Sequence, residues 1–245
     1  SMRNVVIMLP TLDEAKGLEV VAKNIPSQKI KQMGWNYQVW VVDGGSTDET
    51  KSISLQNEFH FMPQQGKGKG AAMRLGFTKF LQSGYDALVM LDSDGTYDAK
   101  EIPHFLDKLT KNDVVVGDRL NGNIDPNAMT RLNYFGNHIL TWLATGMYGI
   151  TINDLCSGYW GFTKKAISRM KLNSMKFEIE AEMYTSCVKE ELMIKNIPIR
   201  YSARLGHAKL GSISDGWRIF RKLIVRRIFG SPIEAKIGKG NLDIE

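Results

Sequence analysis

Ala87-Leu88-Val89-Met90-Leu91-Asp92-Ser93-Asp94-Gly95-Thr96 is the stretch that decides how this 245-residue chain folds. Its apolar run, residues 87–91, has the length and the boundaries of a buried parallel strand. Ligands of an open α/β sheet bind at the carboxyl ends of its strands, so Asp92 and Asp94 should emerge where a ligand binds. Two carboxylates this close repel unless a cation separates them, and their hard oxygens suit Mg²⁺ or Mn²⁺. A simple polar turn explains this stretch alone equally well.

The first half of the chain repeats a unit made of a short apolar run, a turn rich in Gly or Asp, and a helical pattern. Strands are expected at residues 4–9, 37–42, 59–63, 87–91 and 114–117, with helices at 14–25, 48–57, 70–83 and 99–110. Such alternation implies right-handed βαβ crossovers. It predicts an α/β fold with a mostly parallel central sheet and helices on both faces.

The second half is predicted to be more helical. Helices are expected at 127–147, 164–170, 178–190 and 214–229, and a last strand at 194–201, which Pro198 confines to an edge or a bulge. We expect one domain over residues 1–211, followed by an amphipathic helix and tail over residues 212–245.

The composition favours a folded protein with anionic partners. Hydrophobic residues make up 43% of the chain, and 32 Lys and Arg against 26 Asp and Glu give a net charge of +6, which suits nucleotides, lipid phosphates or nucleic acid. Cys156 and Cys187 lack paired spacing, which argues against a disulfide framework or a zinc site and for a reducing compartment. No apolar stretch approaches the ~20 residues of a membrane span or resembles a signal peptide, so a cytoplasmic protein is expected.

Polar residues follow the other predicted strands as well. Asp43, after the second strand, could accept hydrogen bonds from a base or a ribose, although the residues at 46–48 also fit a helix cap. A Gly/Lys loop at 65–72 opens a helix, where free N–H groups with Lys67 and Lys69 favour a diphosphate; a flexible basic loop is an equally good interpretation. Arg119 follows the fifth strand. Ordinary turns do not require this whole set, so together these residues predict a nucleotide and metal site.

These residues resemble the inverting family 2 glycosyltransferases, which have the nucleotide-diphospho-sugar transferase (GT-A) fold. The matching motifs run in family order over nearly half of the chain: Leu9-Pro10-Thr11-Leu12-Asp13-Glu14, Val42-Asp43-Gly44-Gly45-Ser46-Thr47-Asp48, Gly66-Lys67-Gly68-Lys69-Gly70, Asp92-Ser93-Asp94 and Val116-Gly117-Asp118-Arg119. Dolichyl-phosphate mannose synthases and related polyprenyl-phosphate sugar synthases look like the closest branch. Residues 154–162 and 197–210 resemble two further motifs of that branch.

The resemblance implies a role for each matching position. The residues expected to bind the nucleotide are Pro10, Leu12, Glu14, Asp43, Lys69 and Asp92. The DXD motif, Asp92 and Asp94, would bind Mg²⁺ or Mn²⁺ carrying the diphosphate. The candidates for the acceptor phosphate are Arg119, Arg131, Arg204 and Lys209, which with the C-terminal helices would form the acceptor side. The expected catalytic residues are Asp94, Arg119 and Asp154.

The implied reaction transfers a sugar from a nucleotide-diphosphate sugar to dolichyl or polyprenyl phosphate, with inversion and with a metal ion. A phosphate monoester has a second pKa of ~6 and is already largely dianionic at neutral pH. It therefore needs cations to hold it in line more than a strong base. Asp154 could orient the acceptor or an arginine, act as a base, or only cap the following turn.

Departures from the branch pattern leave some details open. Thr96 stands where the branch often has Gln, a better metal ligand, so water is expected to complete the shell. Residues 207–208 replace the x-Ser of a Gly-x-Ser-Lys motif, which keeps Lys209 but loses a hydroxyl. The sequence at 157–162 resembles archaeal N-acetylglucosamine or glucose synthases more than mannose synthases. The donor is thus GDP-mannose, a UDP-hexose or a UDP-N-acetylhexosamine.

Peripheral contact with an anionic membrane, at its cytoplasmic face, is expected through the last predicted helix. It has an apolar stripe with Trp217 and Leu223, and Arg218, Lys222 and Arg226 on the other side. Such a helix can lie in a bilayer surface or pack on the core with a solvated basic face. The second candidate lipid surface is the helix from 127, but for most of its apolar side chains a buried position is favoured; these are Leu132, Phe135, Ile139, Trp142 and Leu143.

Three other functions compete with this interpretation. A sugar-1-phosphate nucleotidyltransferase should have a Gly-rich loop after the first strand, where this chain has Pro10-Thr11-Leu12-Asp13. A family 2 transferase acting on a glycan or protein hydroxyl would need a clear base. A basic nucleic-acid-binding domain would show a recognised motif, and none is present, so we expect no nucleic-acid partner.

Overall fold

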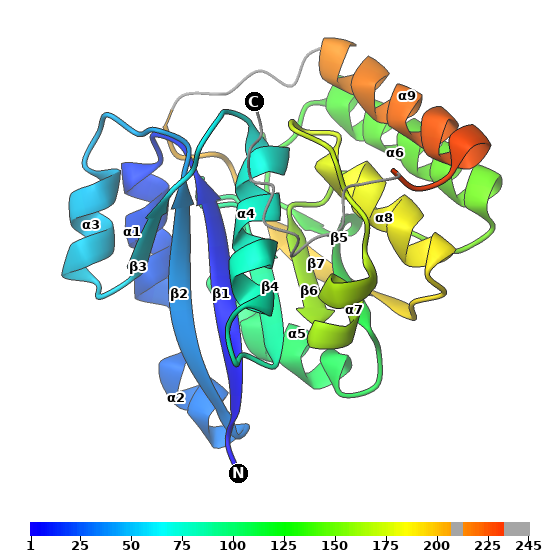
Figure 1. The fold of residues 1–245 in the computed structure, drawn as a ribbon. Coiled ribbons are helices and arrows are strands. Elements are labelled where there is room, and N and C mark those ends of the chain that lie inside the picture. Colours follow the sequence, from blue (N-terminus) through cyan, green and yellow to red (C-terminus); the bar gives the residue numbers. More distant parts are fainter. Residues whose placement is uncertain (207–212, 233–245) are drawn as a thin grey trace.

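Among the residues that the structure describes, the central element is a sheet of seven strands in the order β3-β2-β1-β4-β6-β5-β7. The computed structural model describes residues 1–206 and 213–232, and Figure 1 shows helices packed around this sheet. Neighbouring strands are parallel except at β6, which is antiparallel to both β4 and β5, so the expected mostly parallel sheet is confirmed. The strands are β1 (Arg3–Thr11), β2 (Trp35–Asp43), β3 (His60–Pro63), β4 (Ala87–Leu91), β5 (Val114–Ile124), β6 (Tyr159–Thr163) and β7 (Ile194–Tyr201).

The second half of the sheet differs most from the sequence prediction. β6 is not predicted, because its run of five residues is short and contains Gly161, which weakens a strand pattern. β5 continues beyond its predicted end at Gly117, and its register with β7 is irregular between Asp118 and Asn123. β7 lies at the edge of the sheet, as Pro198 predicts.

The described helices cover both faces of the sheet, as expected. On β1, Val6 and Met8 face a first core shared with α4, α6, α7, α8 and α9, whereas Val5 and Ile7 face a second core shared with α1, α2, α3 and α5. The short α2 is not predicted by the sequence. The helices are α1 (Ala15–Asn24), α2 (Ser27–Gln32), α3 (Thr50–Gln56), α4 (Lys69–Leu81), α5 (Ile102–Leu109) after a 3₁₀ turn (Ala99–Glu101), α6 (Arg131–Tyr148), α7 (Lys164–Arg169), α8 (Ile179–Lys189) and α9 (Ile213–Phe229).

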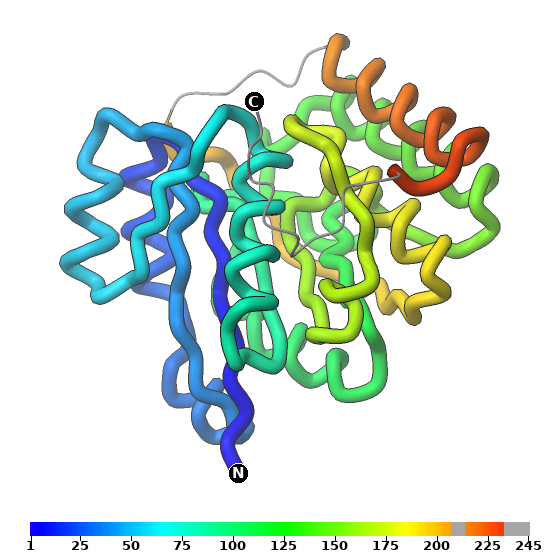
Figure 2. Tube along the Cα trace, in the orientation of Figure 1, coloured from blue at the N-terminus to red at the C-terminus, as the bar shows by residue number. Residues whose placement is uncertain are grey.

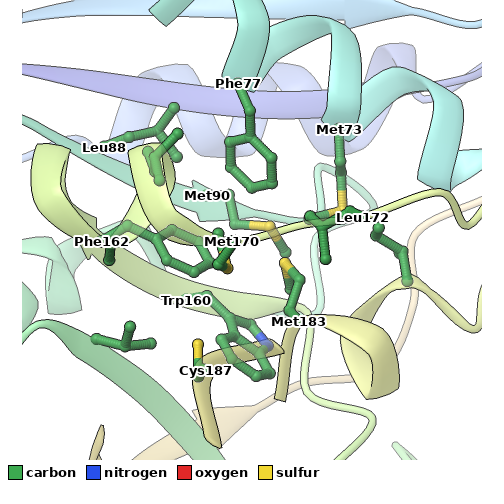
Figure 3. Close-up of a cluster of buried hydrophobic side chains, with 14 of the residues drawn as sticks. Met73, Phe77, Leu88, Met90, Trp160, Phe162, Met170, Leu172, Met183 and Cys187 are labelled. Carbon is green, nitrogen blue, oxygen red and sulfur yellow. The ribbon is translucent and has the colours of Figure 1, made fainter. Parts of the chain in front are cut away.

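Aromatic and sulfur side chains from distant parts of the chain interlock in the first core (Figure 3). Phe77 of α4 meets Phe162 of β6 edge to face, with ring centroids 5.3 Å apart, and Trp160 stacks on Phe162 at 5.9 Å. Met90 of β4 is buried among them. This packing holds the start of α4 and the end of β4 in a fixed relation, and both segments lead into the cavity described below.

The last described helix, α9, packs beside α6 and α8 (Figure 2). Its Ile219 and Leu223 are buried in the first core. Lys222 and Arg226 point inward and pair with Glu182 of α8. Part of the expected basic stripe is therefore bound to the protein. The expected domain boundary after residue 211 lies outside the described residues and stays a prediction.

α6 exposes the apolar side chains for which a buried position was favoured, and that expectation is wrong. Leu132, Phe135 and Trp142 are 79%, 63% and 75% exposed. These positions share one face of the helix, whereas Thr141 and Ala144 on the other face are buried. Apolar residues occur on both faces of α6, so the sequence could not tell which face packs against the core. No helix within the described ranges is both long enough and apolar enough to span a bilayer.

Replacing Glu182 with alanine is expected to lower the free energy of unfolding by about 3–5 kcal/mol, because it leaves buried cations unpaired. The Glu182 carboxylate is fully buried, accepts from Arg226 Nε at 2.9 Å, and accepts the backbone N–H groups of residues 173–174. Urea unfolding measures the loss. Glu190→Ala breaks a partly exposed pair with Lys171 and should cost no more than about 1 kcal/mol. Equal losses in the two variants would contradict this assignment.

Candidate active site

A cavity of about 440 Å³ opens at the carboxyl ends of β1, β2, β3 and β4. This volume lies in the usual range for small-molecule sites, and the position is the one expected for an open α/β sheet. Motifs that are separate in the sequence thus meet around one space. The described lining consists of Pro10, Thr11, Leu12, Glu14, Gly44, Gly45, Gln64, Lys67, Gly68, Lys69, Ala72, Asp92, Ser93, Asp94, Phe177 and Arg204.

Hydrogen bonds between the turns after β1 and β2 fix one wall of this cavity. Asp13 Oδ1 accepts the backbone N–H of Thr47 at 2.7 Å, and Asp48 Oδ2 accepts the backbone N–H of Ala15, the first residue of α1, at 3.1 Å. Asp48, in the turn after β2, therefore stabilises the start of α1, which follows the turn after β1. The free N–H groups and the dipole at a helix start favour a carboxylate. Pro10, Leu12 and Glu14 are held on the wall by this arrangement.

Asp43 shapes the turn after β2 and is not part of the described cavity wall. Its Oδ2 accepts the backbone N–H groups of Gly45 and Ser46 at 3.0 and 2.9 Å, and its Oδ1 accepts the hydroxyl of Ser46. Both carboxylate oxygens are therefore used within the turn. The expected contact between Asp43 and a base or ribose stays a prediction.

The two carboxylates of the DXD motif each contact a cation. Lys69 Nζ lies 2.6 Å from Asp92 Oδ1, and Arg204 Nη1 lies 2.9 Å from Asp94 Oδ2. Each of these cations also contacts a second carboxylate, Glu180 in the case of Lys69 and Glu14 in the case of Arg204. The structure thus brings together the predicted residues of the nucleotide and metal site, Asp43 excepted.

Burial shapes the protonation of this cluster. It raises the pKa of Asp92 and the pKa of Glu180, while the positive charge of Lys69 opposes both shifts. Burial by itself would lower the pKa of Lys69, but the adjacent carboxylates outweigh it and raise that pKa above its ordinary value. Lys69 therefore stays charged at neutral pH.

The charges of the cluster fit a divalent cation. The row Glu180, Lys69, Asp92, Asp94, Arg204 and Glu14 contains four carboxylates and two cations, so carboxylates outnumber cations among these six residues. Asp92 and Asp94 supply the hard oxygen ligands that Mg²⁺ and Mn²⁺ prefer. No cluster of three or more His, Cys, Asp or Glu side chains in the described part of the chain could hold a metal.

Thr96 orients the carboxylate of Asp94. Its backbone N–H and its hydroxyl both donate to Asp94 Oδ1, and Thr96 itself is buried. Gly158 is required on the other side of the motif, because a Cβ there would lie 2.2 Å from Asp92 Oδ2. The backbone N–H of Gly158 donates to the Tyr97 hydroxyl at 2.7 Å. Thr96 therefore fixes the carboxylate of Asp94, and Gly158 leaves room for the carboxylate of Asp92.

The expected catalytic residues Arg119 and Asp154 form a buried ion pair. Arg119 Nε and Nη2 donate to Asp154 Oδ2 and Oδ1 at 2.8 and 2.9 Å, and the Arg119 backbone N–H donates to Oδ2 at 2.9 Å. The guanidinium also donates to Asn137 and lies 5.0 Å from the ring centroid of Tyr201. Of the roles left open for Asp154, the geometry supports the orientation of an arginine.

The four acceptor-phosphate candidates do not all meet at the cavity. Arg204 lies on its wall, and Arg119 is buried in its pair with Asp154 and is absent from the described lining. Arg131 is the exposed first residue of α6. Lys209 lies outside the described residues. Their joint binding of the acceptor stays a prediction.

Sequence reasoning missed Glu180, the second partner of Lys69. A Glu in the first turn of a helix ordinarily suggests a favourable charge near the helix dipole. Here the side chain is buried because α8 packs on the same core as α4, and 111 residues separate Glu180 from Lys69. The sequence feature that could have indicated Glu180 is the pair of acidic residues, Glu178 and Glu180, that follows Phe177. Phe177 itself lines the cavity.

The fold and this site define a nucleotide-sugar transferase of the GT-A type. The chain belongs to glycosyl transferase family 2, whose family model matches residues 6–170, and it is therefore a glycosyltransferase. The expected resemblance to this family is confirmed.

Individual relatives agree with this placement. Glycosyltransferase AglJ of Haloferax volcanii is 35% identical over 232 residues, which cover 94% of this chain and 74% of the relative. A dolichyl-phosphate hexose transferase of the same organism is 28% identical over 188 residues, which cover 76% of this chain and 79% of the relative. A crystal structure of glucosyl-3-phosphoglycerate synthase from Mycobacterium tuberculosis with Mn²⁺, UDP and phosphoglyceric acid shares the fold. Its TM-score is 0.71 at 15% identity, covering 95% of this chain and 80% of that one.

Proposed function

We propose that this chain transfers a hexosyl or N-acetylhexosaminyl group from GDP-mannose or a UDP-sugar to dolichyl or polyprenyl phosphate, with inversion and with Mg²⁺ or Mn²⁺. One observation carries the proposal: every carboxylate on the described cavity wall is paired with a cation, Asp92 with Lys69 and both Asp94 and Glu14 with Arg204. A hydroxyl acceptor requires a base for its proton. A phosphate monoester is largely dianionic at neutral pH and brings its own nucleophilic oxygen.

The donor would bind with its diphosphate at the start of α4 and its nucleoside between the turns after β1 and β2. Lys67, Lys69 and the free N–H groups of the first turn of α4 supply positive charge for the diphosphate. Pro10, Leu12 and Glu14 line the space proposed for the nucleoside. A divalent ion held by Asp92 and Asp94 would neutralise charge that develops on the leaving nucleoside diphosphate.

The acceptor phosphate would approach the anomeric carbon from the side opposite the leaving diphosphate, so that a single displacement inverts the configuration. Arg204 is the acceptor candidate on the cavity wall, and we assign it the phosphate dianion. Arg119, oriented by Asp154, adds a buried positive charge that also lowers the pKa of Asp92, against the effect of burial. Arg131 and Lys209 complete the proposed acceptor set.

The named relatives support the class of donor and acceptor. One relative in Haloferax volcanii is a dolichyl-phosphate hexose transferase. The glucosyl-3-phosphoglycerate synthase of the same fold holds Mn²⁺ and UDP. The test is a panel of GDP-mannose, UDP-glucose and UDP-N-acetylglucosamine, each incubated with polyprenyl phosphate and Mg²⁺ or Mn²⁺, with the lipid product identified by mass spectrometry. We expect one donor to dominate and EDTA to abolish product; no lipid product from any donor would refute the proposal.

We also propose that the protein meets the membrane through α6, at the cytoplasmic face. The exposed stripe on α6, formed by Leu132, Phe135, Ile139 and Trp142, has the aromatic and aliphatic character of an interfacial helix. α6 contains no Asp or Glu and begins with Arg131, which suits anionic lipid. α9 contributes exposed Trp217, while two of its cations are bound to Glu182.

The double substitution Leu132→Ser and Trp142→Ser is expected to reduce sedimentation with anionic vesicles at low salt by about tenfold, because each buried apolar side chain contributes about 1.5–3 kcal/mol and only part of it inserts. Leu55→Ser is the matched control, since Leu55 is 57% exposed on α3, away from this stripe. Arg221→Glu on α9 should have a smaller effect that disappears at high salt. Unchanged sedimentation of the double variant would refute the role of α6.

A further inference from the structure

The charges at the DXD motif alternate in a way that the transfer reaction alone does not require. Lys69 bridges Asp92 and Glu180, and Arg204 bridges Asp94 and Glu14. Each metal-site carboxylate therefore has a cation on it, and each of these cations has a second carboxylate as partner. Glu180 and Glu14 are these second partners.

A divalent ion and these two cations compete for the same carboxylate oxygens. Lys69 Nζ is 2.6 Å from Asp92 Oδ1, and Arg204 Nη1 is 2.9 Å from Asp94 Oδ2. A metal ion on those oxygens would lie close to both positive charges, and in a partly buried site that repulsion is strong. Metal binding therefore requires Lys69 and Arg204 to move away from the aspartates or to be neutralised.

Glu180 and Glu14 allow Lys69 and Arg204 to move without leaving a buried charge unpaired. The Lys69 side chain is only 9% exposed, so a Lys69 without any partner would be costly. Glu180 is buried and would remain as its partner when Asp92 turns to the metal. Glu14 is placed to do the same for Arg204. The released ammonium group of Lys69, the first residue of α4, would then be available to the diphosphate that is proposed to bind at this helix start.

We propose that Lys69 and Arg204 are resident counter-ions of the DXD motif, which divalent metal replaces only together with a nucleoside diphosphate, while Glu180 and Glu14 retain the displaced cations. This inference rests on the proposed function. The diphosphate supplies the negative charge that lets two cations and a metal ion share one site. Metal and nucleotide must then strengthen each other's binding by the same factor, because coupling between two ligands is reciprocal.

The test is the binding of Mn²⁺ to the full chain, followed by the electron paramagnetic resonance signal of free Mn²⁺, first alone and then with UDP or GDP. In Lys69→Met, Mn²⁺ should bind about tenfold more tightly without nucleotide, because a competing cation is gone. With nucleotide the same variant should bind Mn²⁺ about tenfold more weakly, because a diphosphate partner is gone. Arg204→Met should likewise tighten nucleotide-free Mn²⁺ binding, because it also removes a cation from a metal-site carboxylate.

Lys176→Met is the matched control. Lys176 is exposed and next to Phe177 in the chain, but it is neither part of the described cavity lining nor one of the described partners of Asp92. Its removal changes the net charge equally and should alter nucleotide-free Mn²⁺ affinity by less than about twofold. The inference is overturned if Lys69→Met leaves nucleotide-free affinity unchanged or weakens it. It is also overturned if Lys176→Met raises that affinity as much.

Failure of this inference can be told from failure of the proposed function. Asp92→Asn should abolish Mn²⁺ binding both with and without nucleotide, since Asp92 is a proposed ligand. Persistent binding in Asp92→Asn would refute the metal site itself. Loss of binding in Asp92→Asn, together with no gain in Lys69→Met, would leave the metal site intact and refute only the exchange of counter-ions.

Discussion

Sugar transfer by the Asp94→Asn variant is expected to fall by about 10²- to 10³-fold at saturating Mg²⁺ or Mn²⁺, because a neutral amide would not hold and position the metal ion that neutralises the charge on the leaving diphosphate. Asparagine can still accept the hydrogen bonds from Thr96, so the turn should keep its shape. The measurement is the rate of sugar-lipid formation at several metal concentrations. The loss should persist at every metal concentration that restores nucleotide binding.

Asp98→Asn is the control for this change. Asp98 follows the same turn, and its side chain accepts the backbone N–H of Lys100 at the start of a 3₁₀ turn, outside the described cavity lining. Its substitution should leave transfer within about twofold of the wild type, as expected for a change away from the site. Full activity in Asp94→Asn would refute the assignment of the DXD motif as the metal and diphosphate site.

The second large effect is expected at the buried pair of Arg119 and Asp154. Asp154→Leu should lower the free energy of unfolding by about 3–5 kcal/mol, because Arg119 is left buried without its carboxylate. The double variant Arg119→Met and Asp154→Leu should recover most of that stability, since an apolar pair of similar volume often replaces a buried ion pair without loss. Urea unfolding of the two variants and the wild type measures both effects.

The rate of sugar transfer tells whether the pair of Arg119 and Asp154 has a functional role beyond stabilising the fold. We expect the stable double variant to remain deficient in transfer by at least about tenfold, because the acceptor side loses an oriented guanidinium. Raising the lipid phosphate concentration should restore part of the rate if Arg119 acts in acceptor binding. Wild-type transfer in the double variant would show that the pair only stabilises the fold.

The features of this fold that could be predicted from the sequence are those whose local pattern is compatible with a single kind of structure. The run that ends at Asp92 predicts a parallel strand, and the turns after the first strands predict a ligand site, because parallel strands bring their carboxyl ends together. The Gly/Lys loop predicts positive charge at a helix start. These features need only short-range patterns and one topological rule, and the structure places them around one cavity.

The remaining features depend on contacts between distant residues. Arg119 and Asp154 are 35 residues apart, and although the orientation of an arginine is one expected role of Asp154, no local pattern identifies which arginine it contacts. β6 joins the sheet antiparallel to its neighbours, which periodicity does not predict. The exposure of Trp142 depends on which face of α6 meets the core, and apolar residues occupy both faces. Glu180 becomes a site residue only because α8 packs close to the start of α4.

The most direct test of the central claim compares two acceptors that differ only at the reacting end: polyprenyl phosphate and the corresponding polyprenol. Each is incubated with the preferred nucleotide sugar and metal, and sugar-lipid product is quantified by mass spectrometry. We expect transfer to the phosphate and none to the alcohol, because the carboxylates on the described cavity wall are paired with cations and the acceptor must bring its own charged oxygen. Efficient transfer to polyprenol or to a sugar hydroxyl, with none to polyprenyl phosphate, would contradict it.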